Sequence, residues 1–163
     1  MLFRSKKLKD NPVEIQGNKI GVVEMDKYLG FKISSKGVED SIRKTIDDRR
    51  KKAWSRLFTM KRLLRHPVIQ KNGFLRSGII LFKAAIVPIL MYSDDCWFGM
   101  SKNMINDLES IYRKLLYRFF DIPMKTKYEA VLIELGLMKA ENIMASHKLC
   151  YINKIWKIGR AHV

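Results

Sequence analysis

An apolar stretch from Ser77 to Trp97 constrains the fold more than any other part of the sequence. Between Ser77 and Met91 the only charged residue is Lys83, and apolar residues fall on every side of a helical projection. The part from Ser77 to Met91 is too short, and too interrupted by Lys83 and Pro88, for a membrane span of about 20 consecutive apolar residues. We therefore predict a central buried helix, in which Pro88 makes a kink or starts a new turn, with Lys83 at the edge of the buried face.

The charge of the chain is the second constraint. Its 163 residues, 47% of them hydrophobic, can form one domain with a real core and a small appendage. Lysine and arginine number 32 against 16 acidic residues, a formal net charge of +16. Such an excess favours a polyanionic partner, with nucleic acid as the first expectation and an anionic membrane surface as the second.

Several classes of site are disfavoured. Cys96 and Cys150 lie far apart in no CxxC or Cys/His cluster, which argues against a zinc site or a disulfide framework. The three histidines are scattered, and the glycines form no phosphate-binding loop. We find no signal peptide or membrane span, so we expect an intracellular protein of the nucleus or cytoplasm without a membrane partner.

Residues 1–36 are typical of β-structure. We expect short strands at Val13–Ile15, Ile20–Val23 and Lys27–Ser34, separated by turns at Gly17–Asn18 and Glu24–Asp26. Strands this short are marginal alone, so this first region must pack on helices or on a part that is absent.

A long basic helix is predicted from Val38 to about Arg65, ending at His66–Pro67. Apolar residues form one stripe, and basic residues with Trp54 and Phe58 among them lie on another side. A solvated charged face is the plain interpretation of such a helix. The near absence of acids after Asp48 favours a nucleic-acid contact instead. The candidate binding residues are Arg43, Lys44, Arg50, Lys51, Trp54, Lys61, Arg62 and Arg65.

Further helices complete the second region, residues 37–156. Ser101 is a plausible N-cap for a helix running to about Phe120, with a broad apolar stripe. Short helices are expected at about 127–135, with Gly136 as a left-handed cap, and from about Lys139 onward. The predicted fold class is mainly α: a small N-terminal β element followed by a bundle of four to five helices.

The order of several short motifs resembles one protein family. These are Tyr28-Leu29-Gly30, the basic helix around Arg49–Ala53, the segment Pro88–Tyr92 leading to Cys96-Trp97, Leu108–Leu116 and Glu134-Leu135-Gly136. Together they resemble the C-terminal, thumb-side part of reverse transcriptases from non-LTR (LINE-like) retrotransposons, over about residues 1–156. The resemblance implies that Tyr28, Leu29 and Gly30 form a hairpin that grips the primer at the palm–thumb junction, and that the basic helix lies along the template–primer duplex.

The same resemblance bears on Tyr92-Ser93-Asp94-Asp95, which has the form Y-x-D-D of the polymerase metal site. It implies that this segment lies in the thumb and that the catalytic palm, with its Mg²⁺, is missing. A two-metal site also needs a third carboxylate on a neighbouring strand, and Asp26 is the best candidate. The competing plain interpretation is that Asp94 and Asp95 end the core helix in solvent. We expect no cofactor and no polymerase activity in this chain alone.

Both ends of the chain suggest a piece of a longer protein. Met1–Phe3 is typical of a strand interior, and residues 157–163 match the translation of a common sequencing adapter, so we treat them as a scar without biological content. The expected function is sequence-independent binding of a template–primer duplex. The alternative is a stand-alone basic helical module that binds RNA or DNA, which would leave the β-rich start unexplained.

Overall fold

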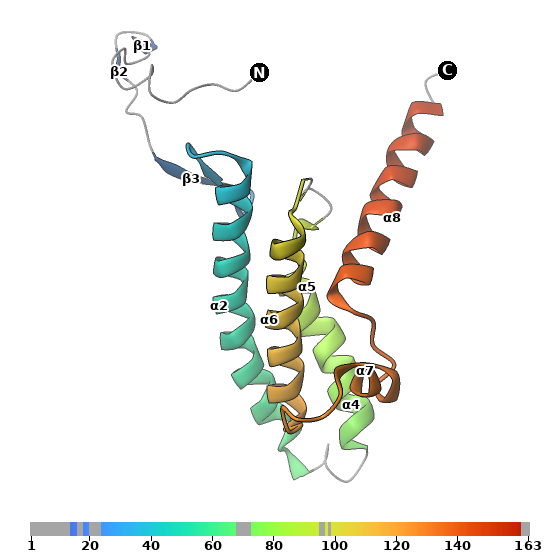
Figure 1. Ribbon diagram of the computed structural model, residues 1–163. Helices are drawn as coiled ribbons and strands as arrows, with labels where there is room; N and C mark the ends of the chain where they lie inside the picture. The colour runs from blue at the N-terminus through green and yellow to red at the C-terminus, as the bar shows by residue number, and fades with distance from the viewer. Residues whose placement is uncertain are drawn as a thin grey trace. The chain divides into compact units, whose positions relative to one another are not determined.

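The computed structural model describes residues 14–15, 18–19, 24–67, 73–94, 97 and 99–160. The chain divides into two compact units, Met1–Thr45 and Ile46–Val163, which are described separately. The described residues form four short strands followed by helices, so the predicted fold class is confirmed (Figure 1). The predicted division after residue 36 remains a prediction.

Two antiparallel hairpins make up the strands of the first unit. Strand β1 (Glu14–Ile15) pairs with β2 (Asn18–Lys19), and β3 (Met25–Tyr28) pairs with β4 (Phe31–Ser34). The predicted turns at Gly17–Asn18 and Glu24–Asp26 were placed wrongly in part, because Asn18, Met25 and Asp26 lie in strands. The predicted strand at Ile20–Val23 lies outside the described residues.

The single strand predicted over Lys27–Ser34 is wrong, because the chain reverses at Leu29–Gly30. Both residues have positive φ, 45° at Leu29 and 84° at Gly30, as the tight type I′ hairpin turn requires. Leucine is rare in that conformation, so the turn is not visible in composition. The hairpin at Tyr28-Leu29-Gly30 that the resemblance implied is therefore present.

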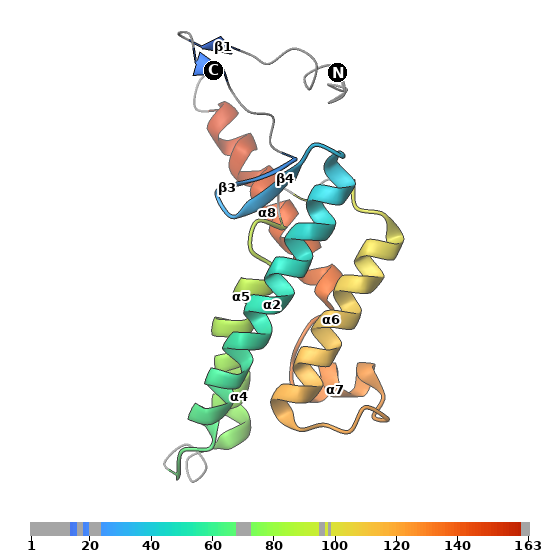
Figure 2. The ribbon, with the colours of Figure 1, turned by 90° about the vertical axis from the view of Figure 1, so that its left-hand side faces the viewer.

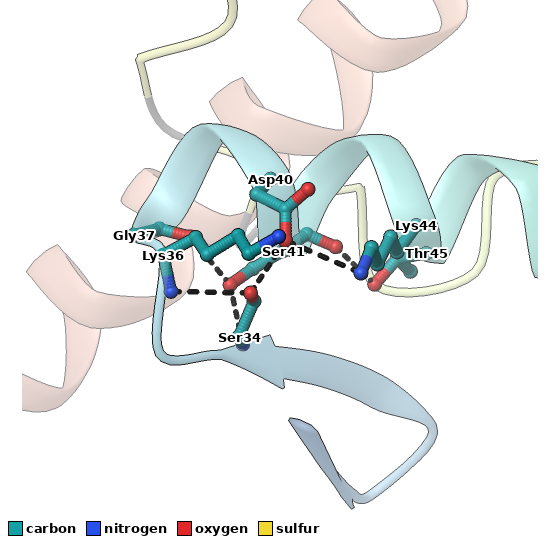
Figure 3. A network of polar contacts seen from close by, with 7 residues as sticks. All are labelled: Ser34, Lys36, Gly37, Asp40, Ser41, Lys44 and Thr45. Carbon is teal, nitrogen blue, oxygen red and sulfur yellow. Dashed lines mark hydrogen bonds and ion pairs between the residues drawn. The ribbon is translucent and has the colours of Figure 1, made fainter. Parts of the chain in front are cut away.

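A chain of hydroxyl groups joins β4 to the start of the next helix (Figure 3). The Ser34 hydroxyl donates to Asp40 Oδ2 at 2.5 Å, and the Ser34 amide donates to Ser41 Oγ at 2.8 Å. One turn further on, Thr45 Oγ1 accepts from the Lys32 amide at 2.9 Å. Ser41 and Thr45 are buried, and these bonds satisfy their hydroxyls and the backbone of β4 together.

Helix α2 runs from Val38 to Leu64, which confirms the predicted helix. The apolar residues of its predicted stripe are all buried: Ile42, Ile46, Ala53, Leu57, Met60 and Leu64. Tight backbone bonds from Arg65 to Arg62 and from His66 to Leu63 end the helix just before Pro67, as expected.

The apolar stretch forms a continuous helical segment with a wider turn in its middle. It comprises α4 (Phe74–Leu81), the π-helical η1 (Phe82–Ile86) and α5 (Val87–Leu90). The π-turn lies directly before Pro88, whose missing N–H and bulky ring disfavour a regular α-turn there. The irregularity expected at Pro88 is therefore present as a π-turn.

The prediction that this segment is buried on every side is wrong. Phe82, Ile86 and Leu90 are fully buried on one face, but Leu75 and Ile80 are 47% and 58% exposed. Uniform apolar composition showed that the segment packs, but not how much of its surface is covered. Lys83 is exposed and donates to the Gly136 carbonyl at 3.0 Å, in keeping with its predicted edge position.

Helix α6 (Lys102–Phe120) contributes seven buried residues, against four in α4, η1 and α5. Its predicted N-cap is confirmed, because Ser101 Oγ accepts from the Met104 amide at 3.4 Å. The core residues of α6 are Met104, Leu108, Tyr112, Leu115, Leu116, Tyr117 and Phe119. A Cβ on Gly78 of α4 would come within 2.8 Å of Phe120 Cε1, so this glycine permits the close approach of α4 to α6.

Two helices complete the second unit, α7 (Tyr128–Glu134) and α8 (Ala140–Arg160), as predicted. Gly136 has φ +57°, and the Leu137 amide donates to the Leu132 carbonyl, which confirms the left-handed cap. Figures 1 and 2 show α8 running alongside the other helices at its start and extending past them. Lys157–Arg160, assigned to the scar, form its last turn.

Among the described residues no helix combines the length and apolar character that crossing a bilayer requires.

Candidate nucleic-acid interface

The predicted cations in the first half of α2 are paired with acids on the same helix. Arg43 binds Glu39 at 3.0 Å, and Lys44 binds Asp40 at 3.5 Å. Each pair is exposed and lies one helical turn apart, so it contributes little free energy and can exchange for a phosphate. The two acids nevertheless cancel the two cations, so the start of α2 has no excess charge for a polyanion.

The second half of α2 carries the positive excess. Arg50 and Lys51 share Asp47, at 2.6 and 3.1 Å, and no aspartate or glutamate follows Asp48 until Asp94. Arg62 and Arg65 are exposed and form no ion pair with the described residues. Because Arg50 and Lys51 share one carboxylate and Arg62 and Arg65 pair with none in the described residues, this half of the helix remains net positive.

Lys61 differs from the other predicted cations. Its ammonium donates to the Arg118 carbonyl at 2.8 Å and pairs with Asp121, the left-handed cap of α6. Its side chain is only 13% exposed. The structure therefore gives Lys61 a packing role, tying the end of α2 to the end of α6.

Five residues form a continuous line along the outside of α2, which we call the outer stripe: Lys51, Trp54, Phe58, Arg62 and Arg65. They recur at spacings of three and four, so they share one helical face. The rings of Trp54 and Phe58 lie 6.1 Å apart at 34°, and Phe58 is 51% exposed. An aromatic pair thus stands between cations at both ends.

A groove opens beside Trp54, where α2 meets the C-terminal half of α6. Its volume is about 390 Å³. The lining residues, apart from Trp54, are Lys114, Tyr117, Arg118, Asp121, Ile122, Pro123 and Met124. Within the described part of the chain, the side chains of Lys114 and Arg118 make no hydrogen bond or ion pair, whereas Asp121 is neutralised by Lys61. The groove is therefore apolar inside and cationic at its edge.

Lys114 and Arg118 are not among the binding residues predicted from the sequence. Their spacing of four residues shows that they share a face of α6. That this face meets Trp54 is a tertiary fact without a local sequence signal.

The predicted hairpin residues are presented to solvent at the β3–β4 turn. Tyr28 is 66% exposed and Leu29 is 75% exposed, while Gly30 completes the turn. Exposure of two large apolar side chains at a tight turn is compatible with a contact surface. They belong to the first unit.

Two residues of the Y-x-D-D segment, Asp94 and Tyr92, contact side chains of other helices. Asp94 follows α5 in a turn and is 2% exposed, so the interpretation of a solvated helix end is wrong for this residue. Both its carboxylate oxygens lie 2.9 Å from Nδ1 of His147 in α8, a residue that sequence reasoning left unassigned. The Tyr92 ring lies 4.4 Å below the guanidinium of buried Arg49. Asp95 lies outside the described residues.

The described residues around Asp94 do not form a cluster of metal ligands. The described residues contain no group of three or more His, Cys, Asp or Glu side chains that could hold a metal ion. Asp94 is not on a strand, and Asp26 lies in β3 of the other unit. The geometry around Asp94 is that of a packing contact between helices.

Comparison with known proteins identifies no relative: no family model, no curated protein and no solved structure matches this chain. Interpretation of the interface therefore depends on its charge, the aromatic pair of half-buried Trp54 and exposed Phe58, and its groove.

Proposed function

We propose that this chain binds nucleic-acid duplexes through the outer stripe of α2, without regard to base sequence. The observation that carries the proposal is the line Lys51, Trp54, Phe58, Arg62 and Arg65, in which exposed cations flank an aromatic pair made of half-buried Trp54 and exposed Phe58. Helical spacing holds these side chains on one rigid face, which extends about 21 Å from Lys51 to Arg65.

The physical basis is release of counterions from phosphates. Each phosphate neutralised by a lysine or arginine adds about 0.9 to the magnitude of the salt exponent of binding for a double helix. Phosphate contacts fix position and carry no base information, so unrelated duplexes should bind alike. The Trp54–Phe58 pair offers an apolar surface for sugars and base edges.

Within this proposal the chain is the thumb-side portion of a non-LTR retrotransposon reverse transcriptase. The support is the order of motifs described above, together with the tight turn at Tyr28-Leu29-Gly30. The polymerase chemistry and its Mg²⁺ would belong to a palm outside this chain, and the expected compartment is the nucleus or cytoplasm. A stand-alone basic module is the alternative, favoured by the fact that residues 46–163 bury a core of their own.

The test is fluorescence anisotropy with two 20-base-pair RNA–DNA hybrids of unrelated sequence, at several KCl concentrations. We expect equal affinities and a steep loss of affinity with salt. The triple variant Lys51→Ala, Arg62→Ala, Arg65→Ala should reduce the salt exponent by about 2–3 and weaken binding more than tenfold.

A matched control removes the same charge elsewhere. Lys102→Ala, Lys154→Ala, Lys157→Ala changes three exposed lysines outside the stripe. It should leave most of the affinity in place. Equal losses in the two triple variants would mean that only net charge matters, and a strong preference between the hybrids would contradict sequence-independent binding.

The two parent hypotheses are separated by the nucleotide sequence upstream of Met1. An open frame continuing into a palm with its own Y-x-D-D motif supports the thumb assignment. An in-frame stop preceded by a promoter supports the stand-alone module.

A further inference from the structure

The groove beside Trp54 is not needed to hold a regular duplex. In a duplex the bases are stacked and paired, so their faces cannot reach a side chain. The groove nevertheless joins an indole wall, an apolar floor and two cations without polar partners in the described residues. A ligand with both an aromatic face and negative charge would complement this combination.

The size and chemistry of the groove suit one nucleotide. Its volume of about 390 Å³ falls within the range of about 300–1,000 Å³ typical of small-ligand sites. Trp54 can stack on a base, and Tyr117, Ile122 and Pro123 supply apolar contacts. Lys114 and Arg118, one helical turn apart on α6, are placed for the phosphates on either side of that base.

Charge around the groove favours the same ligand. Asp121 is the one acid in its lining, and Lys61 neutralises it. A second groove, lined by Phe74, Leu75 and Glu134 among others, is similar in size but has no lysine or arginine in its lining. Of these two grooves, only the one beside Trp54 is therefore lined by both aromatic and cationic side chains.

We propose that this groove binds an unpaired nucleotide of a single-stranded segment that adjoins the duplex. The proposal rests on the proposed function, because it places the single strand next to the duplex held by the outer stripe. It adds a site that distinguishes a duplex with an overhang from a blunt one. The ligand class is a nucleotide of RNA or DNA recognised by stacking and by its phosphates, whatever its base.

The experiment compares three hybrids by anisotropy with the full chain: blunt, with a four-nucleotide thymidine overhang, and with an abasic overhang of equal charge. We expect the thymidine overhang to raise affinity about 5- to 100-fold over the blunt hybrid. The abasic overhang should give little of that gain, because it keeps the phosphates but removes the base.

Variants identify the groove as the cause. Trp54→Ala should abolish the gain, Trp54→Phe should retain part of it, and Lys114→Ala should reduce it for both overhangs. Leu75→Ala, in the second groove, is the matched control and should keep the full gain. Equal binding of thymidine and abasic overhangs, or an undiminished gain in Trp54→Ala, would overturn the proposal.

A single-stranded thymidine octamer and its abasic counterpart separate this proposal from the proposed function. If the blunt hybrid fails to bind while the octamer binds through Trp54, duplex binding is wrong and the groove assignment stands. If the blunt hybrid binds with the expected salt dependence and neither octamer nor overhang responds to Trp54→Ala, the groove assignment alone is wrong.

Discussion

Two tyrosines of α6 show how much one hydroxyl partner matters in the same core. Tyr112 and Tyr117 are each 1% exposed. The Tyr117 hydroxyl donates to the Thr126 carbonyl at 2.6 Å, whereas the Tyr112 hydroxyl has no hydrogen-bond partner among the described residues. Burial, with the nearby charge of Glu109, raises the pKa of Tyr112 above its ordinary value, so the phenol remains neutral.

The matched pair of substitutions gives opposite expectations. Tyr117→Phe should lower the free energy of unfolding by about 1 kcal/mol, because it leaves the Thr126 carbonyl without its hydrogen-bond donor. Tyr112→Phe should leave it unchanged or raise it slightly, since it removes a buried group without a partner. Urea unfolding followed by circular dichroism measures both. A larger loss in Tyr112→Phe than in Tyr117→Phe would show that the Tyr112 hydroxyl has a partner.

Asp40 gives a prediction about pH at the start of α2. The Ser34 hydroxyl, followed by the charge of Lys44, holds the pKa of Asp40 below its ordinary value. A carboxyl with a lowered folded-state pKa stabilises the fold above its unfolded-state pKa, and that contribution is lost as the pH falls through the folded value. Ser34→Ala should raise the pKa of Asp40 in an NMR titration. An unchanged pKa of Asp40 in this variant would contradict the network in Figure 3.

At the scale of elements, Asp94 links the end of α5 to α8. The charge-assisted contact with His147 is supported by Lys148, which donates to the Trp97 carbonyl at 3.0 Å. Asp94→Asn should lower the free energy of unfolding by about 1–3 kcal/mol. Asp107→Asn, an exposed change on α6, is the control and should have little effect.

The same variant tests the catalytic interpretation of the Y-x-D-D segment. If Asp94 is a packing residue, Mg²⁺-dependent primer extension should be absent from the original chain as well as from Asp94→Asn. Extension that the original chain performs and Asp94→Asn abolishes, at unchanged stability, would restore the metal-site hypothesis.

Helices were predictable where local chemistry determines their limits. Ser101 caps α6, Gly136 ends α7 and Pro67 follows α2, and each signal acts within a few residues of the chain. The resemblance implied the hairpin at Tyr28-Leu29-Gly30, but strand patterning missed the β3–β4 turn, because Leu29 takes a positive φ that its residue type does not favour. The burial of the apolar stretch was overestimated, because composition does not show how much of a helix surface other helices cover.

The interface was predictable only in part, for the same reason. Helical spacing places Lys51, Arg62 and Arg65 on one face of α2. Pairing of Arg43 with Glu39 is also a local matter that spacing could have indicated. Capture of Lys61 by Asp121, sixty positions further along, and the groove facing Trp54 depend on how helices pack.

At the scale of the whole molecule, the elements of the two units differ in how many of their residues are buried. The β3–β4 hairpin buries one residue, Ser34, and its other residues are exposed or half-buried. By contrast, α6 contributes seven buried residues to the core of the second unit. Local opening costs little free energy where few apolar side chains are buried, and a lone hairpin is marginal in water.

Hydrogen exchange followed by mass spectrometry should therefore resolve two stabilities in the intact chain. Amides of β3 and β4 should exchange early, and those from Leu108 to Phe119 should exchange last, near the rate set by global unfolding. The Ser34 and Lys32 amides, bonded to Ser41 and Thr45, should be the slowest of the hairpin. Adding a blunt RNA–DNA hybrid should slow exchange along the second half of α2. Equal protection of the hairpin and α6 in the free chain would mean that the two units unfold as one.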